Sequence, residues 1–134
     1  MNLSIPLAIG IGGFTGALLR FYISGAITKS AGEEFSFVGT LMVNLIGCFA
    51  IGVLATIASR TSSLSPTMQK CLITGLLGSL TTFSTFALDS LKLMQDGRFG
   101  AAIGNLSLNL IAGLLLVWLG TLAAGTVFPG ESTP

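Results

Sequence analysis

Four long apolar stretches, joined by short polar segments, account for most of this 134-residue sequence. These stretches are residues 4–27, 37–58, 71–94 and 99–128. A helix that crosses a bilayer needs about 20 mostly apolar residues, and each stretch is long enough. The sequence therefore predicts an all-α membrane protein with a single four-helix transmembrane domain, residues 1–134. We expect it to be a multi-pass protein of the cell (inner) membrane.

The charge content supports membrane residence and excludes several functions. Charged residues make up 8% of the chain, against about 25% in a typical soluble domain. The net charge of +1 provides no basic patch to neutralise phosphates, so we expect no nucleic-acid partner. The chain has no histidine, which argues against a zinc site and a Ser–His–Asp triad. With no nucleophile–base pair visible, we expect that the protein is not an enzyme.

The basic residues of the loops show almost no preference for one orientation in the membrane. Four spans place both termini on one side, together with Arg60 and Lys70, whereas Lys29, Lys92 and Arg98 lie opposite. Loop Lys and Arg residues set orientation, and two against three is a weak bias. Two interpretations fit equally well: insertion in both orientations, with pairing of opposed copies, or a single orientation with a weak signal.

Small residues suggest close helix packing. Glycine accounts for 18 of the 134 residues, about twice its usual share of roughly 7%. Three small-residue pairs lie four positions apart: Gly12 and Gly16, Gly75 and Ser79, and Gly100 and Gly104. Such spacing lets membrane helices approach closely, although glycine is also common in these helices in general. Because four thin helices enclose little interior, we expect a homo-oligomer.

The third stretch has an unusual centre, with many hydroxyl groups where apolar residues are expected. The segment 78–82, Gly-Ser-Leu-Thr-Thr, supports a helix poorly because threonine is β-branched and its hydroxyl competes for backbone groups. We predict a break there. Non-helical backbone at membrane depth survives only when protein or water covers it. Its freed carbonyls are suitable ligands for a hard cation such as Na⁺.

Two phenylalanines follow this segment. Phe83 and Phe86 are three residues apart and therefore share a helix face. Aromatic edges carry partial positive charge, and the hydroxyls of Ser84 and Thr85 can donate hydrogen bonds. This surface can hold an anion without a fixed positive charge. The alternative is that the rings are packing residues and the hydroxyls bond to carbonyls of the preceding turn.

Other polar residues inside the stretches are candidates for the same path. Asn44 carries an amide that can donate two hydrogen bonds, while Asn105 and Asn109 share a face of the fourth stretch. Each is alternatively an interhelical hydrogen-bonding residue, worth roughly 1 kcal/mol. Arg20 is a basic residue inside the first stretch. Its side chain either faces a vestibule and attracts anions or reaches to the headgroups.

Two other functions are compatible with a small four-helix membrane protein. A proton-coupled small multidrug exporter usually needs a titratable group at mid-depth, and no stretch has an acid at its middle. A non-transporting membrane assembly subunit needs no ion path at all. These remain the alternatives to an ion channel.

Three motifs occur in register along the chain. They are Gly-Gly-x-x-Gly-Ala-x-x-Arg at residues 12–20, Gly-Thr-x-x-x-Asn-x-x-Gly at 39–47 and Thr-Gly-x-x-Gly-x-x-Thr-Thr-Phe-Ser-Thr-Phe at 74–86. Together they resemble the Fluc/CrcB family of fluoride channels over nearly the full chain. The third motif is the most specific, since both phenylalanines and the glycine before them fall in register.

This resemblance implies a fluoride-selective channel for passive efflux, built as an antiparallel, dual-topology homodimer in membrane lipid. The third helix is expected to be broken, and a central structural Na⁺ is expected on the backbone carbonyls of Gly78 and Thr81. The fluoride path implied by the family runs along these positions of the chain: Asn44, Phe83, Ser84, Thr85, Phe86, Asn105 and Asn109. Gly113 departs from the polar track of the fourth helix, because it has no side chain.

Overall fold

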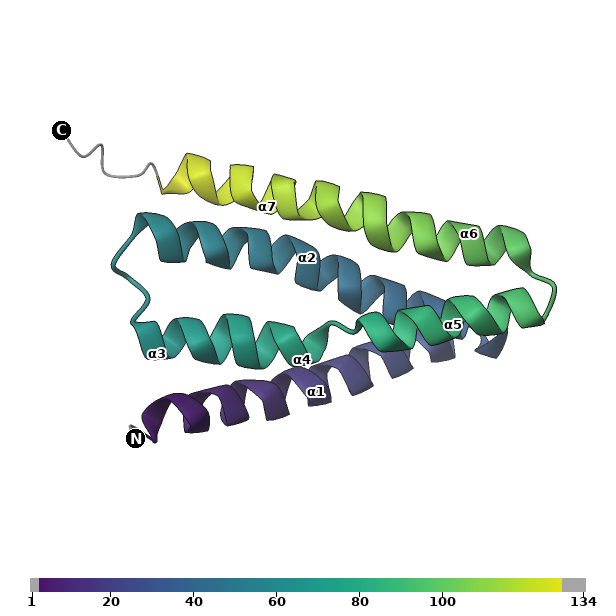
Figure 1. The fold of residues 1–134 in the computed structure, drawn as a ribbon, viewed down its shortest axis with the longest axis horizontal. Coiled ribbons are helices and arrows are strands. Elements are labelled where there is room, and N and C mark those ends of the chain that lie inside the picture. Colours follow the sequence, from purple (N-terminus) through teal and green to yellow (C-terminus); the bar gives the residue numbers. More distant parts are fainter. Residues whose placement is uncertain (1–2, 129–134) are drawn as a thin grey trace.

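The chain forms four helical spans, which run back and forth along the long axis of the molecule (Figure 1). The computed structural model describes residues 3–128. The first span is α1, Ser4–Ala31, and the second is α2, Ser36–Arg60, preceded by a 3₁₀ turn, η1, at Glu33–Phe35. Between α1 and η1, Gly32 has a φ of 94°, in the left-handed region where glycine is favoured.

The third and fourth spans are each composed of several helical segments. The third consists of α3 at Pro66–Gln69, the π-helical segment η2 at Lys70–Leu77, α4 at Gly78–Leu80 and α5 at Phe83–Gln95. The fourth consists of α6 at Phe99–Ser107, a π-helical segment η3 at Leu108–Ala112, and α7 at Gly113–Val127. Within residues 3–128 every regular element is helical.

The observed helices agree with the four predicted apolar stretches. Each of the four is long and apolar enough to cross a membrane, over Ser4–Ala31, Glu33–Arg60, Pro66–Gln95 and Phe99–Val127. The start of α1 and the end of α7 lie at the same end of the molecule, at the left of Figure 1. The all-helical multi-pass architecture predicted from the sequence is thus confirmed.

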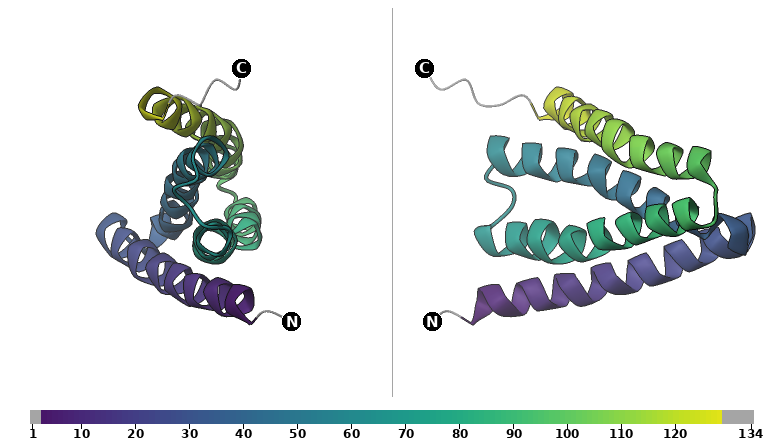
Figure 2. Two further views of the ribbon diagram at one scale, coloured as in Figure 1. Left: turned by 90° about the vertical axis from the view of Figure 1, so that its left-hand side faces the viewer. Right: turned by 45° about the vertical axis from the view of Figure 1, so that its right-hand side comes forward.

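Glycine allows the spans to approach one another closely. In the end-on view of Figure 2, α2 lies between α1 and α7. A Cβ atom built on Gly120 of α7 would overlap the carbonyl oxygen of Phe49 in α2, and one built on Gly52 would overlap that of Val117. On the other side of the molecule, Gly12 and Gly16 of α1 are packed as tightly against η2. By contrast, a Cβ at Gly100 or Gly104 would meet open space.

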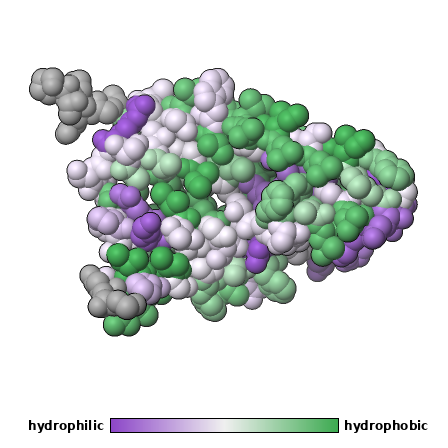
Figure 3. Space-filling model, in the orientation of Figure 1, coloured by the Kyte–Doolittle hydropathy of each residue, from purple (hydrophilic) through white to green (hydrophobic). Residues whose placement is uncertain are grey.

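Apolar side chains remain exposed along the outside of the spans. In Figure 3 apolar residues cover much of the visible face, and the hydrophilic ones lie mostly toward its two ends. Phe14 in α1 and Leu114 in α7 are 69% and 73% exposed, respectively. Large apolar faces of this kind are unstable in water and suit the hydrocarbon of a bilayer.

Candidate functional site

The third span is interrupted near its middle by two residues with extended backbone. Thr81 has φ −85° and ψ 154°, and Thr82 has φ −150° and ψ 117°. The Thr82 hydroxyl then accepts a hydrogen bond from the backbone N–H of Thr85 at 3.2 Å, which caps the start of α5. The sequence predicts a break over residues 78–82, whereas residues 78–80 are helical in the structure and the extended backbone is confined to Thr81 and Thr82.

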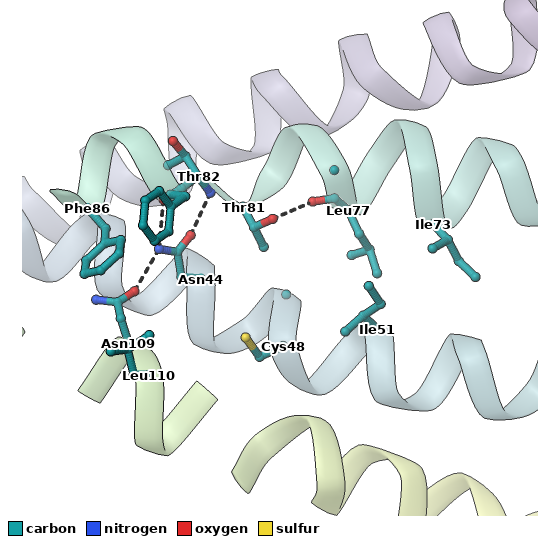
Figure 4. A pocket seen from close by; sticks show the side chains of 13 residues that line it. Asn44, Cys48, Ile51, Ile73, Leu77, Thr81, Thr82, Phe86, Asn109 and Leu110 are labelled. Atoms are coloured by element: carbon teal, nitrogen blue, oxygen red, sulfur yellow. Dashed lines mark hydrogen bonds between the residues drawn. The ribbon is translucent and has the colours of Figure 1, made fainter. Parts of the chain in front are cut away.

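Asn44 of α2 forms a paired contact with the extended backbone of Thr82. Its Nδ2 donates to the Thr82 carbonyl at 3.2 Å, and its Oδ1 accepts from the Thr82 N–H at 2.8 Å. In a continuous α-helix that N–H would donate to the carbonyl of Gly78, four residues earlier. The side chain of Asn44 therefore takes the role of the missing helical partner, as Figure 4 shows.

A glycine in α2 makes room for this arrangement. Gly47 is buried, and a Cβ atom built on it would overlap the Cγ2 methyl of Thr81. Gly47 lies almost one helical turn after Asn44, so both residues face the interruption. The sequence thus places an amide and a vacant side-chain position together on α2, opposite the two threonines.

The interruption lines a cavity of about 320 Å³ between the second, third and fourth spans. Its polar lining comes from Asn44, Thr81, Thr82 and Asn109, and Figure 4 shows these side chains with the apolar ones around them. The remaining lining residues are Gly47, Cys48, Ile51, Ile73, Leu77, Gly78, Phe83, Phe86 and Leu110. The cavity therefore offers neutral donors and acceptors within a mainly apolar wall.

Phe83 and Phe86 lie next to each other at this cavity. Their ring centroids are 5.1 Å apart and their planes are inclined by 75°, an edge-to-face arrangement that aromatic pairs prefer. Phe86 is 4% exposed, whereas Phe83 is 75% exposed. The shared face predicted from their spacing is confirmed, but only Phe86 is enclosed by the chain itself.

Asn44 also begins a series of amide contacts that reaches the fourth span. Its Nδ2 donates to Asn109 Oδ1 at 2.8 Å, and Asn109 Nδ2 donates to Asn105 Oδ1 at 3.0 Å. Asn105 Nδ2 donates to Ser90 Oγ at 2.9 Å, and Ser90 Oγ donates to the carbonyl of Phe86 at 2.8 Å. The structure thereby brings three predicted site residues together: Asn44, Asn105 and Asn109.

Ser90 was not among the residues selected from the sequence. A serine four positions after a phenylalanine on one helix is a common pattern, because its hydroxyl can bond the carbonyl of the preceding turn. Its connection to Asn105 depends on the packing of α5 against α6, which the sequence does not reveal. The sequence feature that could have indicated Ser90 is its position, one helical turn after Phe86 on the same face of the helix.

The other predicted residues lie around the interruption without joining this series. Arg20 lines a second cavity of about 400 Å³ together with Thr82 and Thr85. Ser84 and Thr85 are exposed in the chain, and the Thr82 hydroxyl contacts both, at 3.3 and 3.0 Å respectively. Thr81 Oγ1 bonds back to the Leu77 carbonyl at 3.0 Å.

Any cation at this site would be held by uncharged oxygen atoms. Among the described residues, no group of three or more His, Cys, Asp or Glu side chains is arranged to hold a metal ion. The nearby oxygen donors are backbone carbonyls and hydroxyls, including those of Gly78, Thr81 and Thr82. This donor set suits a hard monovalent cation better than zinc or another transition metal.

Four apolar spans, three of which wall a cavity lined with neutral amides, hydroxyls and phenyl rings, define a small multi-pass membrane protein with a polar site between its helices. The chain belongs to the family of CrcB-like proteins (Camphor Resistance, CrcB), whose model matches residues 7–121. This membership agrees with the resemblance seen in the three sequence motifs.

Several curated relatives cover almost the whole chain. A protein of Opitutus terrae is 41% identical over 124 residues, which are 91% of this chain and 93% of the relative. A Sulfurovum protein is 44% identical over 114 residues, 85% of this chain and 88% of the relative. One from Pelobacter propionicus is 37% identical over 130 residues, 97% of this chain and 98% of the relative. All three are named fluoride-specific ion channel FluC.

Proposed function

We propose that this protein is a subunit of a fluoride-selective ion channel through which fluoride leaves the cytoplasm passively. The names of the relatives support this substrate. The structural observation that carries the proposal is the pairing of Asn44 with the extended backbone of Thr82, beside the Phe83–Phe86 ring pair. This arrangement lies in a cavity walled by three of the four spans.

The chemistry of the cavity suits an anion that must enter and leave. Fluoride holds its hydration water tightly, so a pore must offer several aligned donors in exchange. A fixed positive charge would retain the ion, whereas conduction requires sites that are weak enough to release it. Amide N–H groups, hydroxyls and the positive edges of phenyl rings are neutral donors of this kind. Arg20, in the second cavity, attracts the anion to the entrance.

Asn44 binds the ion by replacing one of its hydrogen-bond acceptors in the protein with fluoride. Its Nδ2 carries two hydrogens, and the acceptors in this structure are the Thr82 carbonyl and Asn109 Oδ1. Fluoride that reaches Asn44 takes the place of one of them. Because a protein oxygen returns when the ion leaves, the amide is satisfied both before and after passage, and release is not costly.

A structural Na⁺ at the interruption is part of the same proposal, with the carbonyls of Gly78 and Thr81 as its ligands. Two features of the chain fit this role. The N–H of Thr82 donates to Asn44 Oδ1 and not along the helix toward Gly78, and the extended backbone of Thr81 turns its carbonyl out of the helical pattern. Bound Na⁺ would hold the interrupted backbone in one conformation.

The working unit in this proposal is a pair of oppositely oriented copies. The weak loop-charge bias permits insertion in both orientations. Phe83, which is 75% exposed in the single chain, becomes part of an enclosed path when a second copy covers it. The unpaired apolar faces of the spans then contact either the second copy or membrane lipid.

Fluoride efflux from liposomes that contain the purified protein tests the function. The wild-type protein should release fluoride and retain chloride. Phe83→Ile and Phe86→Ile should each reduce fluoride efflux on the order of tenfold or more, because isoleucine has no positive ring edge. Phe99→Ile, a change of the same kind at the start of α6, serves as the matched control and should retain efflux.

Several outcomes would count against the proposal. Absence of fluoride efflux from wild-type liposomes would favour a non-transporting subunit. The acid that a proton-coupled exporter would have to use inside the third span is Asp89 of α5, which lies beyond the middle of the span. Efflux of a cationic compound driven by a proton gradient, and abolished by Asp89→Asn, would favour the exporter. Unchanged efflux in both ring variants would remove the phenylalanines from the ion path.

A further inference from the structure

We propose that Ser90 and Asn105 are positioning residues, which hold Asn44 and Phe86 in place through a one-directional chain of hydrogen bonds. This inference rests on the proposed function for its effect on conduction, but the chain itself is a property of the fold. Asn105, which the sequence suggested as part of the ion path, is thereby assigned a different role.

The hydrogen bonds of this chain all run in one direction. The Thr82 N–H donates to Asn44, which donates to Asn109; Asn109 donates to Asn105. The series continues from Asn105 to Ser90 and from the Ser90 hydroxyl to the Phe86 carbonyl. Each side chain therefore accepts from its predecessor and donates to its successor. The five bonds connect the second, third and fourth spans.

The chain of bonds closes on the segment where it begins. It starts at the backbone of Thr82, just before α5, and ends at the backbone of Phe86, in the first turns of α5. The start of α5, which carries both phenylalanines, is therefore tied at Thr82 to Asn44 of α2, and at Phe86, through Ser90 of α5 itself, to Asn105 of the fourth span. Aligned hydrogen bonds polarise and strengthen one another at low dielectric, so loss of one link weakens the others.

Burial distinguishes the positioning residues from those that meet the ion. Asn105 and Ser90 are 1% and 2% exposed, and neither lines the 320 Å³ cavity. Asn44 and Asn109 do line it. Asn105 uses its Oδ1 to accept from Asn109 and its Nδ2 to donate to Ser90, with a longer contact of 3.5 Å to the Phe86 carbonyl. Ser90 and Asn105 therefore act on the ion path through Asn109 and Asn44, which line the cavity.

The first test removes the hydrogen bond between Asn105 and Ser90, two residues that do not line the cavity. Ser90→Ala deletes the hydroxyl and leaves the Nδ2 of Asn105 without its acceptor at 2.9 Å. Fluoride efflux should fall about fivefold or more, the change that corresponds to a buried hydrogen bond. The matched control is Thr56→Val, which removes another buried hydroxyl that bonds the carbonyl four residues earlier, Gly52. It should leave efflux near the wild-type value.

A second variant distinguishes a connected chain from a local packing defect. Asn109→Leu cuts the chain between Asn44 and Asn105 while preserving most of the side-chain volume. If Ser90 acts through the chain of hydrogen bonds, Ser90→Ala should add little to the loss of fluoride efflux that Asn109→Leu already causes. Independent defects would add, as they do for uncoupled sites.

A spectroscopic measurement tests the chain independently of conduction. The sequence has four asparagines, and three of them take part in the chain of hydrogen bonds: Asn44, Asn105 and Asn109. In protein labelled with ¹⁵N-asparagine, Ser90→Ala should shift the side-chain amide signal of Asn44, which is three hydrogen bonds away from Ser90. Thr56→Val should leave that signal in place.

These readouts separate the failure of this inference from failure of the proposed function. An unmoved Asn44 signal in Ser90→Ala, or an undiminished loss on the Asn109→Leu background, would overturn the positioning role. If wild-type protein shows no fluoride efflux, the channel proposal fails, yet the Asn44 signal still decides whether the chain of hydrogen bonds exists. Two results together would support the positioning role. Ser90→Ala should shift the Asn44 signal, and it should reduce efflux when Asn109 is present but add little loss on the Asn109→Leu background.

Discussion

At the scale of single residues, one asparagine accounts for the local stability of the interruption. Extended backbone at membrane depth leaves N–H and C=O groups that the helix no longer pairs, and each such group costs about 1–3 kcal/mol if it stays unpaired. Asn44 satisfies both groups of Thr82 at once, at 2.8 and 3.2 Å. An amide side chain combines a donor and an acceptor with this spacing, whereas an ionised carboxylate has acceptors alone.

Asn44→Asp should therefore both destabilise the protein and block fluoride. The carboxylate keeps the acceptor for the Thr82 N–H but replaces the donor with a second oxygen, which faces the Thr82 carbonyl and Asn109 Oδ1. The loss of two donated bonds predicts a decrease of about 2 kcal/mol or more in unfolding free energy. Thermal unfolding in detergent and fluoride efflux measure the two effects.

A matched control for this variant is Gln69→Glu. Gln69 Nε2 also donates to a backbone carbonyl, that of Leu64, at 3.1 Å, but it lies at the start of the third span, away from the cavity. This change should leave efflux largely unaffected. Equal losses in both variants would show that any amide-to-carboxylate change harms the protein and would contradict a specific role for Asn44.

At the scale of elements, the third span depends on contact with α1. The segment η2 packs against α1 where Gly12 and Gly16 have no side chains, and a Cβ on either would overlap backbone carbonyl oxygens of η2. A backbone group cannot move aside without shifting the whole segment. The position of α4, and hence of the interruption after it, is therefore fixed by these two glycines.

Gly16→Ala should shift η2 away from α1 and destabilise the protein by about 1–3 kcal/mol, the usual cost of overpacking. Gly10→Ala is the control on the same helix, since a Cβ there meets nothing within 4 Å. It should be neutral or slightly stabilising, because alanine favours helix by about 1 kcal/mol over glycine. Melting temperatures of the two variants in detergent compare them directly, and similar melting temperatures would contradict close packing at Gly16.

At the scale of the whole molecule, the exposed surface and the loop charges bear on assembly. Large apolar side chains remain exposed on all four spans, so the chain requires lipid, another copy, or both. The five loop Lys and Arg residues are divided two against three between the ends of the spans. Neither feature favours one orientation, which is the basis for proposing opposed copies.

A change in loop charge should test that proposal. Ser62→Lys together with Ser63→Lys adds two positive charges between α2 and α3, and basic loops stay in the cytoplasm. If function needs opposed copies, fluoride efflux from cells should fall sharply, while Ser62→Gln with Ser63→Gln should retain it. Co-expression with a copy that carries Ala31→Lys and Gln95→Lys, at the other end of the spans, should restore efflux. Full activity of the Ser62→Lys, Ser63→Lys chain alone would argue for a single orientation.

The sequence determined the features that follow from local composition and spacing. Apolar length gave four spans, because the thickness of a bilayer fixes the number of apolar residues that a helix needs. The three-residue spacing of Phe83 and Phe86 gave their shared face, because a helix turns about every 3.6 residues. The threonines gave the region of the interruption, because their side chains weaken a helix.

Only the tertiary structure decided which residues meet across helices. The pairing of Asn44 with Thr82, the burial of Asn105, the inclusion of Ser90 and the open space at Gly100 and Gly104 all depend on how spans pack. A sequence shows that a polar side chain lies inside a membrane helix, but its hydrogen-bond partner is set by the rotation and depth of neighbouring helices. In lipid those are fixed by side-chain packing and interhelical hydrogen bonds, with no hydrophobic pattern to mark the contact face.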